Sequence, residues 1–339
     1  MHPTSCSYFG LMQFKADSSS EVVSCIDTCG SRMVVGTFRP YSPCPVYIVS
    51  RVNNSILNRL IHNYPIADLK LSPSDPSMLV TVSDLIRVWN IDSGHLVWVQ
   101  SPHGDQVPDL CPFTAVSFAP SSPGIFAVVD VKGFCSVWDT AKKEAVEIYE
   151  IASEKLVGVS FVTDNVIGCV GDSGAVYVLD RTKHEAICSQ GPQSIVPRCQ
   201  PVRLAWLPHL SMVAVAYQVT GCVSVYDLSS CSTTPRLVGT TKSGESIADI
   251  CWLKSNPEYL VVARDSGAIE VWSRNNLNAP HFDYCCDVGA ASLCCANEGV
   301  LIGTIDGRVV CSPLPSNLSA NPITAFSESP AISYPALAS

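Results

Sequence analysis

The stretch DSGAIEVWS, residues 265–273, carries the pattern that decides the fold. It starts with a polar turn, alternates apolar and polar positions, and ends on a large aromatic side chain, which is typical of a strand that follows a tight turn. Similar stretches occur at 45–50 (PVYIVS), 84–90 (DLIRVWN), 133–139 (GFCSVWD), 172–180 (DSGAVYVLD), 221–227 (GCVSVYD) and 306–312 (DGRVVCS). The positions that correspond to Trp272 are about 44 residues apart on average, so the chain contains an internal repeat.

Each copy of this stretch follows two other strand-like runs. In the sixth copy these are residues 247–252 and 259–263, and most copies add a weaker fourth run such as 96–99. Proline-containing turns such as 72–76 separate the first run from the second, where proline breaks no ladder. Four strands in about 40–45 residues are typical of one blade of a WD40 propeller. The sequence therefore predicts an all-β fold, a seven-bladed WD40 β-propeller.

The two ends of the chain complete this prediction. The seventh copy has no convincing fourth run, because the chain is rich in Ser and Pro between Leu314 and Ser339. A missing outer strand leaves an open sheet edge, and the N-terminal run at 6–14 is the natural segment to close it. We therefore expect one propeller domain over 1–314, with strand 6–14 in its last blade, and a Ser/Pro-rich disordered tail over 315–339.

The composition agrees with buried strands and restricts the class of partner. Of the 339 residues, 47% are hydrophobic and 15% are charged, and the net charge is −9 at pH 7. Nucleic-acid binding depends on clustered Lys and Arg, and no apolar run approaches the roughly 20 residues that span a bilayer. The start, Met1 to Ser5, lacks the basic and apolar segments of an export signal. We expect a soluble, unexported protein with no direct nucleic-acid or membrane partner.

Seventeen cysteines are the unusual feature of the composition. Their number is odd, no C-x-x-C pair occurs, and the doublets at 285–286 and 294–295 would point successive side chains to opposite faces of a strand. Many of the others lie in apolar runs, where a free Cys packs as a small hydrophobe. We expect reduced packing thiols, with a structural zinc site or a catalytic thiol as minor alternatives.

The repeats contain no short catalytic motif, whether nucleophile elbow, P-loop, zinc-protease or dinucleotide-binding. The sequence therefore predicts a protein that is not an enzyme, with no catalytic residue, cofactor or metal. The aromatic residues after the alternating positions, Trp89, Trp138, Tyr226 and Trp272, are interpreted as structural blade residues. The loops of one propeller face remain, at 59–65, 101–112, 193–201 and 242–246, and we expect them to contact proteins.

Four stretches in the first half of the chain share a further resemblance. They are Gly36-Thr37-Phe38, His62-Asn63-Tyr64-Pro65, and the segments 83–89 and 111–118. In order and spacing, over roughly residues 20–140, they resemble the WD-repeat scaffolds of the Transparent Testa Glabra or anthocyanin-regulator type, whose animal relatives dock kinases. The resemblance implies a non-enzymatic adaptor that assembles DYRK-type kinases or transcription factors in the cytoplasm and nucleus, as a monomeric propeller within a complex. The candidate partner-binding residues are His62, Tyr64, Pro65, Arg87, His103 and Asp105.

The chain departs from that family at two kinds of position. The segments 138–141 (WDTA) and 226–229 (YDLS) lack the arginine of the Trp-Asp-x-Arg motif through which some relatives join cullin-RING ubiquitin ligases. The Gly-His dipeptide common in WD blades is also missing from its usual place, so the sequence does not predict the usual Asp-His-Ser/Thr-Trp network. Two alternatives stay open, a structural propeller subunit of a coat, pore or ubiquitin-ligase assembly, and a hydrolase or isomerase that uses the mouth of the channel.

Overall fold

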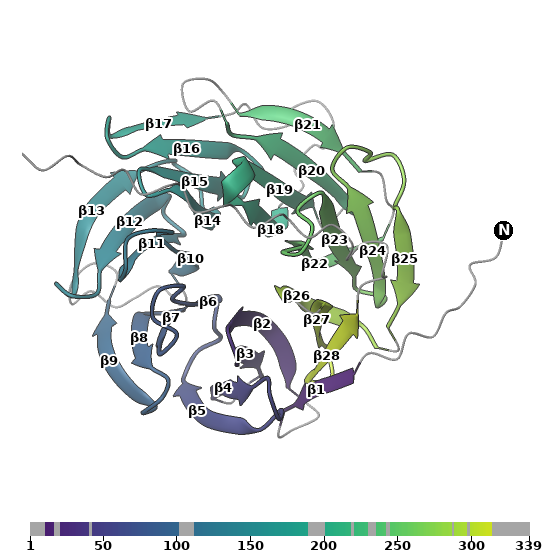
Figure 1. Ribbon diagram of the computed structural model, residues 1–339. Coiled ribbons are helices and arrows are strands. Elements are labelled where there is room, and N and C mark those ends of the chain that lie inside the picture. Colours follow the sequence, from purple (N-terminus) through teal and green to yellow (C-terminus); the bar gives the residue numbers. More distant parts are fainter. Residues whose placement is uncertain are drawn as a thin grey trace, which may run out of the picture.

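Seven four-stranded sheets surround a central axis, each as one blade (Figure 1). This computed structural model describes residues 11–16, 21–40, 43–101, 112–188, 201–217, 220–229, 235–241, 245–286, 288–296 and 299–313. Within every blade, neighbouring strands are antiparallel. The predicted all-β, seven-bladed propeller is confirmed.

The strands follow one another from the axis outward in blades 1 to 6. Blade 1 contains β2 (Val22–Cys29), β3 (Arg32–Phe38), β4 (Cys44–Ser50) and β5 (Ile56–His62). Blade 2 contains β6 (Asp68–Leu71), β7 (Met78–Val82), β8 (Ile86–Asn90) and β9 (His95–Gln100). Blade 3 contains β10 (Phe113–Phe118), β11 (Ile125–Asp130), β12 (Phe134–Asp139) and β13 (Glu144–Glu150). Blade 4 contains β14 (Leu156–Thr163), β15 (Val166–Gly171), β16 (Val176–Asp180) and β17 (Glu185–Cys188).

The remaining blades complete the ring. Blade 5 contains β18 (Pro201–Leu207), β19 (Met212–Tyr217), β20 (Cys222–Asp227) and β21 (Arg236–Thr240), with the short 3-10 helix η1 (Pro208–Leu210) after its first strand. Blade 6 contains β22 (Ile247–Trp252), β23 (Tyr259–Arg264), β24 (Ala268–Ser273) and β25 (Phe282–Cys285). Blade 7 contains β26 (Ala290–Ala296), β27 (Gly299–Thr304), β28 (Arg308–Pro313) and β1 (Leu11–Lys15).

Blade 7 is built from both ends of the described chain. Strand β1 pairs antiparallel with β28, with Leu11 opposite Cys311, and lies at the outer edge of that sheet (Figure 1). Phe14 of β1 is 4% exposed, and its ring centroid lies 5.0 Å from that of Tyr47 in blade 1. Burying such a ring contributes about 1.5–3 kcal/mol. The predicted closure by an N-terminal strand is confirmed for 11–14, whereas 6–10 lie outside the described residues.

The core lies between the blades, because each sheet packs against its two neighbours. Strands in second position, such as β15, β19 and β27, are buried at every residue. Outermost strands such as β9 are largely exposed, which explains why the fourth run of each repeat is the weakest in the sequence. The seven repeat marks all fall in third strands, from β4 to β28, so the register read from the sequence was right.

The turns before the third strands have the expected chemistry. Gly174 and Gly267 adopt φ values of +84° and +92°, which the predicted Asp-Ser-Gly turns require.

Within the described residues, no helix is long and apolar enough to cross a membrane. The expected loop at 59–65 begins only after His62, because β5 continues to that residue. The loops at 101–112, 193–201 and 242–246 lie mostly outside the described residues, and so does the expected tail at 315–339.

Candidate functional site

A pocket of about 530 Å³ opens on the face that the β3–β4 and β5–β6 connections form. It is lined by Phe38, Arg39, Pro40, Pro43, Cys44, Asn63 and Pro65, and we call it the blade 1 pocket. Phe38 is 36% exposed, and the neighbouring Tyr64 is 37% exposed. Two of the predicted partner-binding residues, Tyr64 and Pro65, therefore lie at an accessible surface of aromatic and proline side chains.

A buried carboxylate fixes one wall of the blade 1 pocket. Glu21 has a fully buried side chain, and its Oε2 accepts hydrogen bonds of 3.0 Å from the hydroxyls of Thr37 and Tyr47. Its Oε1 pairs with the guanidinium of Arg39. Because a buried carboxylate must be paired and hydrogen-bonded, this arrangement holds Arg39 at the pocket. Glu21 was not among the residues predicted from the sequence, although its partner Thr37 belongs to the stretch 36–38 that carries the family resemblance.

His62 lies inside the molecule rather than at this surface. Its side chain is 1% exposed, its Nε2 lies 3.5 Å from Thr81 Oγ1, and Trp89 Nε1 donates to the same oxygen at 3.0 Å. Burial, reinforced by the Arg87 charge, lowers the pKa of His62 to about 4. His62 is therefore neutral at pH 7 and connects blade 1 to the interior of blade 2.

The His62–Thr81–Trp89 chain is a partial form of the hydrogen-bond network considered in the sequence. The missing Gly-His dipeptide argued against the usual Asp-His-Ser/Thr-Trp network, and blade 2 contains its His-Thr-Trp part but not the aspartate, because His62 Nδ1 has no hydrogen-bond partner among the described residues. The histidine comes from the end of β5, and a Gly-His spacing was therefore not needed to bring it to Thr81. His62 therefore lies in the core, and its side chain is not accessible to a partner protein.

Arg87 is held by its own blade. Its Nη1 donates to Asp84 Oδ1 at 2.9 Å and to Ser83 Oγ at 3.0 Å, and its Nη2 donates to Asp84 Oδ2 at 3.3 Å. Burial alone would raise the pKa of Asp84, but the hydrogen bonds from Arg87 and Ser83 outweigh it and keep that pKa low. The Arg87 side chain is 11% exposed, so it offers little of its guanidinium to a partner.

The other predicted site residues lie elsewhere. His103 and Asp105 lie outside the described residues. The predicted structural residues are all buried, with exposed fractions of 8% for Trp89, 6% for Trp138 and 2% for both Tyr226 and Trp272. Trp138 Nε1 donates to Ser136 Oγ at 2.8 Å, which is again a bond within the blade.

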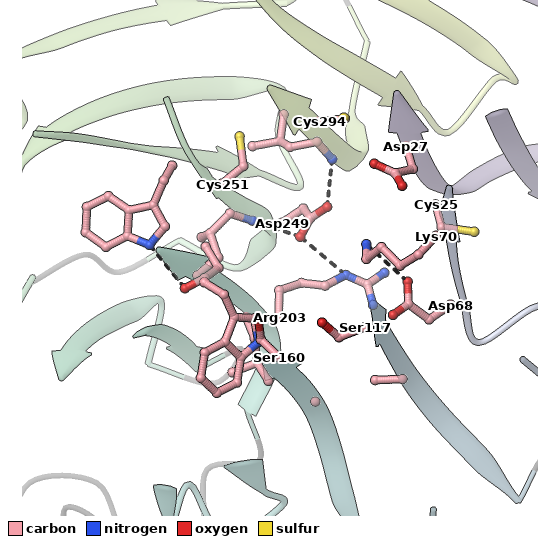
Figure 2. Close-up of a pocket in the computed structure, with 18 of the residues that line it drawn as sticks. Cys25, Asp27, Asp68, Lys70, Ser117, Ser160, Arg203, Asp249, Cys251 and Cys294 are labelled. Carbon is pink, nitrogen blue, oxygen red and sulfur yellow. Dashed lines mark hydrogen bonds and ion pairs between the residues drawn. The ribbon is translucent and has the colours of Figure 1, made fainter. Parts of the chain in front are cut away.

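A second pocket, also of about 530 Å³, lies at the centre of the ring (Figure 2). Residues of the innermost strands β2, β6, β10, β14, β18, β22 and β26 all line it. We call it the central pocket. From the sequence only the mouth of a channel was expected here, and no residue was predicted to line it.

Hydrogen bonds join neighbouring innermost strands around the central pocket. Asp27 Oδ2 accepts from the Leu71 amide at 2.8 Å, Asp68 Oδ2 from the Val116 amide at 3.1 Å, and Asp249 Oδ2 from the Leu293 amide at 2.7 Å. Ser117 Oγ accepts from the Phe161 amide at 3.2 Å, and Trp252 Nε1 donates to the Ala205 carbonyl at 3.1 Å. Each bond crosses from one blade to the next, so the wall of the pocket also holds the ring together.

The charges in the central pocket are of both signs. Lys70 Nζ lies 3.5 Å from Asp68 Oδ1, and Arg203 Nε lies 3.7 Å from Asp249 Oδ1 (Figure 2). Burial raises the pKa of Asp249, although the positive charge of Arg203 acts to lower it. Burial would lower the pKa of Lys70, but the carboxylates of Asp68 and Asp27 raise it. The pocket therefore has a balanced, ion-paired wall rather than a cationic or anionic one.

Within the described residues, no group of three or more His, Cys, Asp or Glu side chains is placed to hold a metal ion. The oxygens of Asp27, Asp68 and Asp249 instead accept hydrogen bonds from backbone amides. The structure therefore presents two candidate binding sites, which are the proline- and aromatic-lined pocket at blade 1 and the ion-paired pocket at the axis.

Comparisons with known proteins agree with the fold. No protein-family model matches the chain, and no curated protein matches it. The solved structure described as "Structure of U3-55K" has a TM-score of 0.74 and 12% sequence identity, and the alignment covers 91% of this chain and 99% of that chain. The "Crystal structure of RRP9 WD40 repeats" gives a TM-score of 0.74 and 12% identity, over 91% of this chain and 98% of that one.

An identity of 12% shows the fold alone. The chain is thus a seven-bladed β-propeller of the WD40 kind in its architecture. These comparisons identify no particular scaffold subfamily for the chain.

Proposed function

We propose that this protein is a non-enzymatic scaffold that binds partner proteins through the blade 1 pocket. The partners we propose are kinases or transcription factors, assembled into signalling or transcription-regulatory complexes in the cytoplasm and nucleus, as the resemblance of residues 20–140 implies. A propeller fold does not specify its function, so the proposal rests on the pocket and on that resemblance.

The accessible aromatic and proline surface is the observation that carries the proposal. Phe38 and Tyr64 are each more than a third exposed. Phe38, Pro43 and Pro65 line the pocket, and Tyr64 precedes Pro65 in the chain. Aromatic side chains and arginine are the residues that most often dominate binding energy at protein interfaces. Arg39 is already positioned by Glu21, so a partner would lose little entropy in ordering it.

One alternative from the sequence meets an obstacle. A subunit of a coat or pore could donate an open blade edge to a strand of its neighbour. In blade 7, however, β1 of the same chain occupies the outer edge of β28. A partner strand at that edge would first have to displace β1.

The test compares the proteins captured by the wild-type chain with those captured by a pocket variant. We expect Phe38→Ala combined with Tyr64→Ala to weaken binding by about 10-fold or more, as for loss of interface anchors. Captured proteins are identified by mass spectrometry, and direct binding of each purified partner is then measured by calorimetry. Thermal unfolding of the variant checks that the propeller stays folded.

Val52→Ala is the matched control. Val52 is 82% exposed and lies in the turn between β4 and β5, at the opposite end of the blade from the pocket. Its replacement should leave partner binding unchanged. Partner binding that is equal in the wild type and the pocket variant, or a wild-type chain that captures no stoichiometric partner, would refute the proposal.

A further inference from the structure

Two cysteines meet across a blade boundary at the wall of the central pocket. Cys251 belongs to β22 of blade 6, and Cys295 belongs to β26 of blade 7. Their Sγ atoms lie 2.9 Å apart. A disulfide bond is about 2.0 Å long, so the two sulfur atoms are about 0.9 Å from bonding distance.

The backbone sets this approach. The bond from the Leu293 amide to Asp249 Oδ2 joins the same two strands, and each cysteine lies two residues beyond one of these partners. Residues two apart on a strand point to the same face, so the register that places Leu293 beside Asp249 also places Cys295 beside Cys251. The contact therefore belongs to the architecture of this boundary and does not depend on a flexible loop.

The position of the pair also gives a reagent access to it. Both cysteines line the central pocket, and Cys251 is partly exposed whereas Cys295 is 4% exposed. A pocket of about 530 Å³ lies within the usual range of small-molecule sites. Cys135 and Cys169 provide a contrast, because both are 0% exposed and lie in the core between blades 3 and 4.

We propose that Cys251 and Cys295 form a reversible disulfide that links blade 6 to blade 7, with a small-molecule disulfide such as oxidised glutathione as the oxidant. The linkage converts a packed boundary between neighbouring blades into a covalent one beside the central pocket. It makes the rigidity of this part of the ring depend on the redox state of the surrounding thiols.

The exchange takes two balanced steps. The Cys251 thiol loses its proton to solvent, its thiolate attacks one sulfur of the oxidant, and the first small thiol leaves and takes up a proton. The Cys295 thiolate, after losing its own proton, attacks Cys251 Sγ and expels the second small thiol. Two protein thiols are oxidised and one small disulfide is reduced to two thiols, so excess thiol reverses the reaction.

The surroundings make this exchange slow rather than immediate. The hydrogen bond with Cys295 and burial together raise the pKa of Cys251, and only the thiolate attacks a disulfide. Cys285 is exposed, so we expect it to react first as a mixed disulfide with the small thiol. The internal pair should follow, and it should keep its bond after the mixed disulfides are removed by mild reduction.

The test treats the full chain with oxidised glutathione, alkylates the remaining thiols, and maps the peptides by mass spectrometry. We expect a peptide pair linked through Cys251 and Cys295, lacking two hydrogen atoms relative to the reduced peptides. Closing this loop should raise the midpoint of thermal unfolding by about 5 °C. Dithiothreitol should reverse both changes.

Single replacements then separate this linkage from general oxidation. Cys251→Ser and Cys295→Ser should each abolish the linked peptide and the thermal shift, and the control Cys285→Ser should keep both. The peptide map of the wild-type chain decides the question even if a variant folds poorly. If Cys285 is fully modified while Cys251 and Cys295 stay reduced, or if either cysteine links to a different residue, the proposal is wrong.

Discussion

Replacement of Glu270 by alanine should strongly destabilise the propeller, because it leaves a buried cation without its counterion. The Arg264 side chain is 0% exposed, and its Nη2 donates to Glu270 Oε2 at 2.6 Å. The same oxygen accepts a hydrogen bond of 2.9 Å from Trp272 Nε1. Arg264 Nη1 also donates to the carbonyls of Gly221 and Glu245, so the guanidinium cannot easily move to solvent.

The magnitude follows from these contacts. Removing one partner of a buried ion pair costs about 3–5 kcal/mol, because the remaining charge stays desolvated. For the 262 residues that the structure describes, the unfolding entropy of about 2.1 cal/mol/K per residue converts this loss into a fall of about 5–9 °C in the unfolding midpoint. Glu270→Gln keeps an acceptor for the Trp272 indole and should lose less than Glu270→Ala.

Thermal unfolding followed by circular dichroism, together with urea titration, measures the loss. Arg236→Ala is the matched control, because the Arg236 side chain is 77% exposed in its ion pair with Asp227. A surface pair of this kind contributes about 0–1 kcal/mol. If Glu270→Ala lowers the unfolding midpoint no more than Arg236→Ala does, the argument from the buried charge is refuted.

Three other sites give further tests. Burial lowers the pKa of His62 from 6.5 to about 4, so the free energy of unfolding should fall as the pH drops through that interval, by about 3 kcal/mol in full. Urea titrations of the wild type and of His62→Gln at pH 7 and pH 4 measure this, and the decrease between the two pH values should be smaller in His62→Gln. Gly133→Ala should destabilise the propeller by about 3 kcal/mol or more in thermal unfolding, because φ is +89° and a Cβ would lie 1.9 Å from the Ala152 carbonyl oxygen. Its control is Gly30→Ala, which should cost about 1 kcal/mol because φ is +57° and a Cβ there would meet open space. Asp249→Ala leaves the amides of Leu293 and Ile250 without their carboxylate acceptor and should cost about 1–3 kcal/mol or more by calorimetry. Asp249→Asn keeps an acceptor oxygen and should cost less.

The sequence predicted the fold because the repeat is a local pattern with a direct physical cause. Where the third run ends on an aromatic, as at Trp89 or Trp272, that side chain packs between blades, and the apolar positions before it face the neighbouring sheets. The weak fourth runs reflect strands with an exposed face. Periodicity, turn residues and burial therefore agreed, and the register, the blade number and the closing strand could all be derived.

The site was harder to derive, because its contacts join residues far apart in the chain. Glu21 reads as a polar residue after a serine run, and only the fold brings it to Thr37 and Tyr47. His62 was expected in the face loop at 59–65, whereas β5 carries it into the core. No local pattern reveals either placement.

The inter-blade bonds could have been recognised in the sequence. The first runs of three copies, 25–28 (CIDT), 66–69 (IADL) and 247–250 (IADI), all place an aspartate in the third position. In the structure these residues are Asp27, Asp68 and Asp249, and each accepts an amide hydrogen bond from the next blade. Alignment of the repeats with one another would have identified these residues as a group.

The pairing of β1 with β28 also has a consequence for synthesis of the chain. Leu11 and Cys311 face each other in blade 7 but are made 300 residues apart. At about 5–20 residues per second, β1 waits on the order of 15–60 s for its partner strand. During that time blade 7 does not exist and the ring cannot close, so six blades can form while β1 still has no sheet to join. A ribosome-associated chaperone that shields unpaired strand edges would therefore need to stay bound longest at this N-terminal segment.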